Sequence, residues 1–180
     1  ETVNGKVKVD LGNREITFTP DPNYSGPASF GYTIKDGNGG FDSATVNIDV
    51  TAVNDAPSIE VTANDFTEDA ADTVAGAVAA TYATGDEDGD TLTVSWTSGA
   101  SPTDGSGDAL YTLDPSNAQV LLTAAGADFV NAGNDLPAID LTVTDDSGAL
   151  NDSASDSDDP AVTLVNDAPT IEVTANDFTE

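Results

Sequence analysis

The chain has 180 residues, of which 33 are acidic and only 4 are basic, so its formal net charge is −29 at pH 7. That length holds one full domain and part of another. The charge excludes nucleic acid and anionic lipid as partners, since both bind through lysine and arginine, and the absence of cysteine excludes disulfide bonds.

The basic residues are confined to the start of the chain, where they are Lys6, Lys8, Arg14 and Lys35. From Asp36 onward, 29 carboxylates have no basic side chain to pair with, so bound cations or high ionic strength must offset their repulsion. In an extracellular domain that lacks cysteine, we expect bound metal ions to stabilise the fold in place of disulfide bonds. The chain also lacks the histidine and cysteine of common nucleophile–base pairs, and we expect no enzyme.

Residues 1–53 alternate between apolar and polar side chains, which predicts four strands, at 6–9, 15–19, 28–35 and 44–51. The inward face that these strands are expected to share consists of Phe18, Phe30, Tyr32, Ile34, Val46, Ile48 and Val50. Four strands would form an open, half-covered sheet with bare edges. We therefore expect either a truncated domain or a sheet that another chain completes.

Residues 54–165 carry a fuller set of strand signals, at 59–63, 74–84, 91–97, 109–113, 119–123, 139–144 and 161–165. Seven short strands separated by turn residues predict an antiparallel β-sandwich with Trp96 in its core. No segment is expected to be helical. The polar stretch 151–159 is expected to be a solvated loop.

A long internal repeat relates the two halves of the chain. Val53–Glu68 recurs as Val165–Glu180 at an offset of 112 residues, and the only change is Ser58 to Thr170. A period of this length predicts a tandem array of domains. We expect the C-terminal half of a repeat at 1–53, a complete repeat at 54–165, and the linker and first strand of a further repeat at 166–180.

Several motifs, taken in order, resemble those of cadherin repeats. The turn at 34–37 and the Val-Asn-Asp-Ala-Pro linker at 53–57 resemble the end of one such repeat. Residues 83–90 resemble the DxD turn, 144–148 resemble the AxDxG turn, and 165–169 repeat the linker. The whole is most similar to the cadherin-like and VCBS-type repeats in the extender regions of large bacterial RTX adhesins. The resemblance implies an all-β fold of elongated, tandem Ig-like or cadherin-like sandwiches.

The same resemblance implies calcium at the junctions between domains, where six to eight oxygen ligands would surround each ion. The central junction would use Asn54, Asp55, Asp86, Asp88 and Asp145, with Asp21 and Asn23 from the preceding domain. Asp36 would serve the preceding junction, and Glu68, Asn166 and Asp167 the following one. The linker is less acidic than in cadherins, which implies fewer ions per junction. Asp86–Asp90 also begins like an EF-hand loop, but Thr91 and Thr97 stand where glycine and glutamate are required.

These expectations combine into a structural extender repeat of a long bacterial cell-surface adhesin, extracellular or secreted and rigidified by Ca²⁺ at its linkers. Its partners would be neighbouring repeats and other copies of itself, and no stretch approaches the ~18 apolar residues of a membrane span. The alternatives are a subunit of an extracellular filament or sheath, assembled by inter-chain strand completion, and a ligand-binding adhesive module. Salt adaptation remains a second explanation for the acidity.

Overall fold

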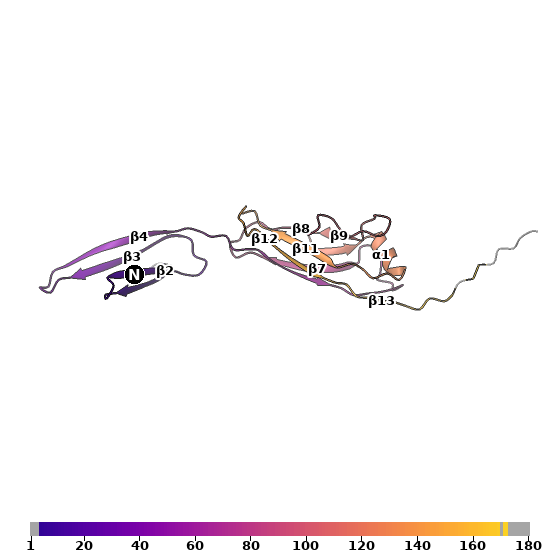
Figure 1. Ribbon diagram of the computed structural model, residues 1–180, viewed down its shortest axis with the longest axis horizontal. Helices are drawn as coiled ribbons and strands as arrows, with labels where there is room; N and C mark the ends of the chain where they lie inside the picture. The colour runs from indigo at the N-terminus through magenta and orange to yellow at the C-terminus, as the bar shows by residue number, and fades with distance from the viewer. Residues whose placement is uncertain (1–3, 170, 173–180) are drawn as a thin grey trace, which may run out of the picture.

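A computed structural model describes residues 4–169 and 171–172 of the chain. Figure 1 shows an elongated molecule in which two β-rich units lie end to end, joined by a strand-free segment. We call residues 4–53 unit 1 and residues 54–165 unit 2. The residues expected to form the first strand of a further repeat, 171–175, lie largely outside the described residues.

Unit 1 consists of two antiparallel hairpins, each a separate two-stranded sheet. Their strands are β1 (Gly5–Asp10), β2 (Glu15–Pro20), β3 (Gly26–Lys35) and β4 (Phe41–Val50). All four predicted strands are therefore confirmed. The hairpins meet where Phe18 stacks on Phe30 with the ring centroids 6.3 Å apart, and Phe30 and Ala28 are buried there.

The predicted core of unit 1 is only partly formed. Phe30 is buried and Val46, Ile48 and Val50 are half-buried, whereas Tyr32 is 39% exposed and Ile34 is 60% exposed. The prediction that Tyr32 and Ile34 are core residues is wrong for the described chain, because no second layer lies over the outer half of β3.

Unit 2 is an antiparallel β-sandwich, as predicted. One sheet has the strand order β5–β7–β10–β9, the other has the order β12–β11–β8, and β6 pairs in parallel with β13. The strands are β5 (Ser58–Ala63), β6 (Phe66–Thr67), β7 (Val78–Gly85), β8 (Thr93–Trp96), β9 (Tyr111–Asp114), β10 (Gln119–Leu122), β11 (Ile139–Thr144), β12 (Ser153–Asp158) and β13 (Val162–Thr163). Fully buried Val120, Ile139 and Leu141 form the centre of the core, and Trp96 stacks on Tyr111 at its edge.

The expectation that no segment is helical is wrong, because α1 (Ala124–Asn131) connects β10 to β11. The Thr123 side chain caps this helix by accepting a hydrogen bond of 3.0 Å from the Gly126 amide. Ala127 and Val130 face the core. Gly126 lets the helix lie against the sheet, since a Cβ there would come within 2.1 Å of the Leu110 carbonyl oxygen.

The polar segment expected to be a loop is instead the edge strand β12. Its Asp156 and Asp158 carboxylates accept hydrogen bonds from the backbone amides of Val61 and Ala63 on β5, at 2.7 and 2.9 Å. The strand is held by carboxylates rather than by apolar side chains, so it shows no hydrophobic alternation. This seam closes one side of the sandwich.

Several strand boundaries also differ from the prediction, and β8 and β9 each begin two residues later than expected. The strand expected at 74–84 begins at Val78, because Thr73 and Ala77 form turns with Ala70 and Val74. The last strand is confined to Val162–Thr163. No helix among the described residues is long and apolar enough to cross a membrane.

Candidate metal centre

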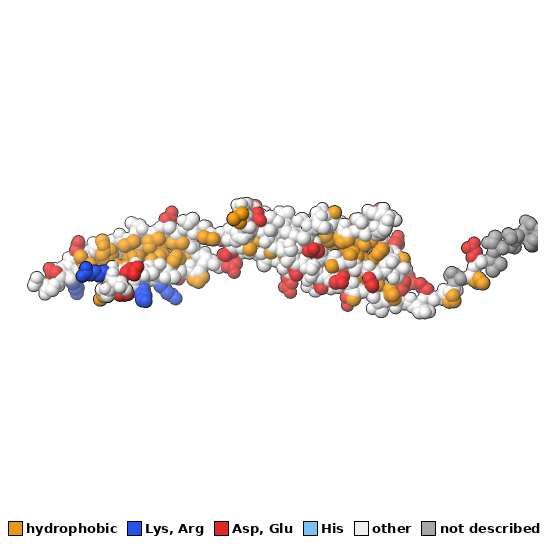
Figure 2. Space-filling view, viewed as in Figure 1, with side chains coloured by type: hydrophobic (Ala, Val, Ile, Leu, Met, Phe, Trp, Pro, Cys, Tyr) orange, Lys and Arg blue, Asp and Glu red, His pale blue; other side chains and the backbone are white. Residues whose placement is uncertain are grey.

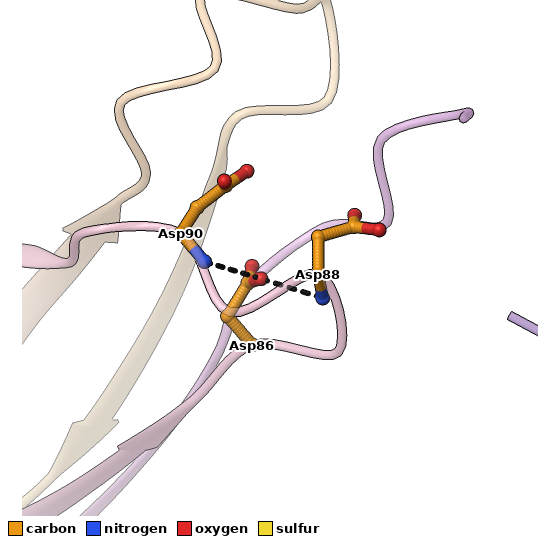
Figure 3. A group of neighbouring side chains, drawn as sticks. All are labelled: Asp86, Asp88 and Asp90. Atoms are coloured by element: carbon orange, nitrogen blue, oxygen red, sulfur yellow. Dashed lines mark hydrogen bonds between the residues drawn. The ribbon is translucent and has the colours of Figure 1, made fainter. Parts of the chain in front are cut away.

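The loop that follows β7 gathers three carboxylates at the end of unit 2 that faces unit 1. One oxygen of Asp86, Oδ1, accepts hydrogen bonds from the backbone amides of Asp88, Gly89 and Asp90, at 2.9, 2.9 and 3.2 Å. The left-handed backbone of Gly89 (φ 79°) turns the chain so that these amides converge. Figure 3 shows the Asp86 side chain lying inside this turn.

The other Asp86 oxygen, Oδ2, is buried and has no hydrogen-bond partner. One carboxylate oxygen from each of Asp86, Asp88 and Asp90 lies within 4.8 Å of the others. Burial, followed by the charges of Asp86, Asp146, Asp145 and Asp88, raises the pKa of Asp90. The cluster is thus a site of concentrated negative charge that contains an unsatisfied oxygen, an arrangement that favours a cation.

The linker between the units is hydrogen-bonded to the same cluster. The backbone amide of Asp55 donates to Asp88 Oδ2 at 2.6 Å, and the Asn54 side chain donates to Asp145 Oδ2 at 3.1 Å. Asn151 Nδ2 donates to the Asn54 carbonyl at 2.7 Å, which fixes the linker from its other side. Five predicted site residues, Asn54, Asp55, Asp86, Asp88 and Asp145, therefore meet at this joint.

Asp145 holds the second loop of the joint in place. It is only 6% exposed and begins the turn between β11 and β12. Hydrogen bonds from the Ser147 hydroxyl, the Asn54 side chain and the Ser147 amide lower the pKa of Asp145. The neighbouring Asp146 accepts a hydrogen bond of 2.9 Å from the Thr91 amide and so links this loop to the Asp86 loop.

Unit 1 reaches the joint through the loop between β2 and β3. Asn23 Nδ2 donates a hydrogen bond to the Glu87 carboxylate of unit 2. A hollow of about 200 Å³ separates the units, and its lining includes Asn23, Asp55 and Asp88. Asp21 lies in the same loop, where its backbone pairs with Asn4 and Tyr24.

The remaining predicted residues lie away from this joint. Asp36 lies at the far end of unit 1, where the backbone amides of Asn38 and Gly40 lower its pKa. At the far end of unit 2, Glu68 is 6% exposed and accepts a hydrogen bond of 2.8 Å from the Val165 amide. Asn166 bonds to the Asp167 carbonyl as Asn54 bonds to that of Asp55, so the linker conformation repeats.

The sequence reasoning missed three acidic residues of the joint: Asp90, Asp146 and Glu87. The signal for Asp90 was present, because Asp86, Asp88 and Asp90 alternate with other residues along one loop. Asp146 follows directly after a predicted ligand. The contact of Glu87 with unit 1 depends on how the two units meet, which a local motif does not encode.

Solved structures with this arrangement include three protocadherins. The protocadherin GammaB4 extracellular domain is 25% identical with a TM-score of 0.56, over 87% of this chain and 24% of that one. The chain has the cadherin-like fold. Protocadherin gammaB7 EC3-6, described as a cis-dimer, is 20% identical with a TM-score of 0.58, over 93% and 38% of the two chains. Protocadherin Gamma B2 extracellular cadherin domains 3-6 are 17% identical with a TM-score of 0.57, over 91% and 39%.

The cadherin-like chain thus spans between about a quarter and two-fifths of the length of these structures. Its N-terminal part also matches a family described as "Bacterial Ig domain" over residues 1–49. No curated protein matches the sequence significantly. Together these similarities support a repeat of Ig-like or cadherin-like type.

Proposed function

We propose that the chain is a structural extender, in which tandem cadherin-like sandwiches of a long bacterial cell-surface adhesin are held in line by Ca²⁺ at their joints. One observation carries this proposal. The linker residues Asn54 and Asp55 are hydrogen-bonded to the acidic loops of unit 2, and within those loops the buried Oδ2 of Asp86 has no partner.

The donor set fits calcium rather than a softer metal. Every candidate ligand offers an oxygen, and the chain has neither histidine nor cysteine. The ion would be held by Asp86, Asp88, Asp90 and Asp145, with Asn54 and Asp55 contributing from the linker. Bound calcium would supply the positive charge that this part of the chain otherwise lacks.

Rigidity follows from the electrostatics of the joint. Without a cation, the carboxylates on the two loops and the linker repel one another, and the strand-free segment between the units is free to bend. A shared ion holds linker and loops together and fixes the angle between the units. Extracellular calcium modules bind with Kd on the order of 10⁻⁴–10⁻³ M. At millimolar calcium and a Kd near 10⁻⁴ M, one site stabilises the fold by roughly 1.4 kcal/mol.

The wider setting of the proposal rests on the fold class and the repeat. Ig-like and cadherin-like domains are typically extracellular, and the identical linker at residues 165–169 supports neighbouring repeats of the same chain as its partners. The cis-dimer described for protocadherin gammaB7 suggests other copies of the chain as further partners. The adhesin of RTX type is the setting that the sequence motifs favour.

The decisive experiment compares calcium binding by three proteins: the unaltered chain, Asp86→Asn and the matched control Asp104→Asn. Asp104 also organises a turn, by accepting hydrogen bonds from the Ser106 and Asp108 amides, but it lies outside the joint. We expect calorimetry to detect calcium binding in the unaltered chain and in the control. Asp86→Asn should weaken it by about tenfold or more, because a charged ligand is lost.

Thermal unfolding gives an independent readout of the same proposal. Millimolar calcium should raise the melting temperature of the unaltered chain and of Asp104→Asn, and much less that of Asp86→Asn. Equal stabilisation of all three proteins, or no binding by the unaltered chain, would contradict a calcium site at the joint.

A further inference from the structure

The turn of the first hairpin in unit 1 has the same side-chain hydrogen bonds as the turn of a hairpin in unit 2. In the β1–β2 turn, Asp10 accepts hydrogen bonds from the Gly12 amide and the Asn13 side chain, both at 2.9 Å. In the β9–β10 turn, Asp114 accepts the same pair of hydrogen bonds, from the Ser116 amide at 3.1 Å and the Asn117 side chain at 2.7 Å. The last residue of each turn, Arg14 or Ala118, has left-handed backbone angles, with φ 57° and 52°. Thus β1 and β2 correspond to β9 and β10.

The second hairpin shows the same correspondence. Asp36 accepts a hydrogen bond from the amide two residues later, as Asp145 does, at 2.8 and 2.9 Å. Three residues after each aspartate stands a left-handed glycine, Gly39 or Gly148. Hence β3 and β4 correspond to β11 and β12, and unit 1 contains the counterparts of the last four long strands of unit 2.

Unit 2 shows what covers these four strands. There the second edge of β10 pairs with β7, and the second edge of β11 pairs with β8. Under that cover Val120, Leu141 and Val143 are fully buried. Their counterparts in unit 1, Ile16, Tyr32 and Ile34, are 39%, 39% and 60% exposed.

The bare surface of unit 1 is therefore extensive. Among the described residues, β2 and β3 each have a strand partner on one edge alone. Figure 2 shows hydrophobic side chains as a continuous band along the visible face of unit 1. An apolar face with two unpaired strand edges is a template for strand addition.

We propose that this face of unit 1 binds a strand segment equivalent to β5–β8, supplied by the same polypeptide on the N-terminal side of β1. In the bound state, a β7-like strand pairs with the free edge of β2 and a β8-like strand pairs with the free edge of β3. Ile16, Tyr32 and Ile34 become core residues. Unit 1 is then a complete sandwich, as unit 2 is, and the polypeptide consists of complete sandwiches in succession.

Connectivity favours the same polypeptide over a second copy. In unit 2 the covering strands directly precede β9 on the chain, and 14 residues connect β8 to β9. Within the described residues, the β7 of unit 2 is already used in its own core, where Ala79 and Ala80 are fully buried. Among the described residues, a second copy therefore offers β7 and β8 only by unfolding its own unit 2.

A fusion protein tests the proposal directly. Residues 57–104 are placed ahead of residue 1 of the whole chain, so that 17 residues separate Trp96 from the turn aspartate Asp10, as 17 separate Trp96 from Asp114 in unit 2. Hydrogen exchange is then measured on β2 and β3, with β10 and β11 of the same molecule as the internal reference. We expect the slowest amides of β2 and β3 to become at least 100-fold more protected than in the unextended chain.

The matched control fusion carries Tyr82→Asp and Val94→Asp in the added segment alone. Tyr82 is buried and Val94 packs against the core in unit 2, so this control should give no protection. The proposal is overturned if both fusions leave β2 and β3 as open as the unextended chain does. It is also overturned if sedimentation shows that the unextended chain is a stable oligomer with these amides already protected, which would favour completion between chains. The outcome should be the same with calcium and with chelator, so it is separate from the test of the metal site.

Discussion

At the scale of single residues, the joint between the units contains charges that oppose folding when no cation is bound. Asp90 is the clearest case, because burial and four neighbouring carboxylates raise its pKa. A carboxyl whose pKa is raised in the folded state destabilises that state at neutral pH, where it is ionised. The same charge is available to a metal ion.

Asp90→Asn should therefore have opposite effects in the two states of the joint. In chelator at pH 7, the variant should melt at a higher temperature than the unaltered chain, because the unfavourable charge is gone. In calcium, it should gain less stability on binding, because a charged ligand is gone. Melting curves with and without calcium measure both effects, and a variant that is less stable in chelator would contradict this account of Asp90.

Acid should weaken the fold through the carboxylates whose pKa is lowered. Hydrogen bonds from the Ala63 and Asp159 amides lower the pKa of Asp158, and the bonds at Ser147 and Asn54 lower that of Asp145. Such groups contribute stability above their unfolded pKa of about 3.8, and this contribution is lost as the pH falls through the lower folded value. We expect the free energy of unfolding, measured with urea in the presence of chelator, to decrease as the pH is lowered below about 4.

At the scale of elements, β12 shows most clearly why part of the fold could not be predicted from the sequence. The four strands of unit 1 and β11 carry apolar alternation and were found from it. The sequence SASDSD of β12 has no such pattern, because its carboxylates bond to the amides of β5. Helix α1 was missed for a related reason, since its alanines and glycine give only a weak periodic signal.

Breaking one bond of the β5–β12 seam should cost measurable stability. Asp156→Ala leaves the part-buried Val61 amide without its acceptor, which we expect to cost about 1–2 kcal/mol of the free energy of unfolding. Ser157→Ala, at an exposed position of the same strand, is the control and should change stability by no more than about 0.5 kcal/mol. Urea denaturation measures the free energy of unfolding of both variants. Equal losses in the two would mean that the hydrogen bonds between β5 and β12 contribute little to stability.

At the scale of the whole molecule, the basic side chains are distributed unequally between the two units. All four basic residues lie in unit 1, and the described part of unit 2 has none to offset its carboxylates. Asp55, Asp86, Asp88 and Asp145 of the joint could be predicted from motif order and linker repetition, whereas Asp90 and Asp146 were missed. The meeting of Asn23 with Glu87, by contrast, arises from how two folded surfaces approach one another. Sequence therefore predicts which loops form the joint better than it predicts the contacts across it.

Solution scattering should separate calcium rigidification from general salt adaptation. With 1–5 mM calcium (about 10–50 times a Kd near 10⁻⁴ M), we expect the extended shape of Figure 1 and a single narrow size distribution. With chelator, the two units should sample a range of angles, and the mean dimension should fall. Sodium chloride at matched ionic strength is the control. If sodium alone restores the extended form, screening rather than calcium accounts for the acidity.

The parallel pairing of β6 with β13 determines how unit 2 responds to tension. Phe66 donates its amide to the Ala161 carbonyl and Glu68 donates to that of Thr163, at 2.9 and 3.0 Å, so the first and last parts of the unit are bonded side by side. Both strands run away from the joint with unit 1. A pull on the two ends of the unit therefore slides these strands past each other and loads their hydrogen bonds together, in shear. A tether built from such units resists force as a set of bonds that must break at once, rather than opening one bond at a time.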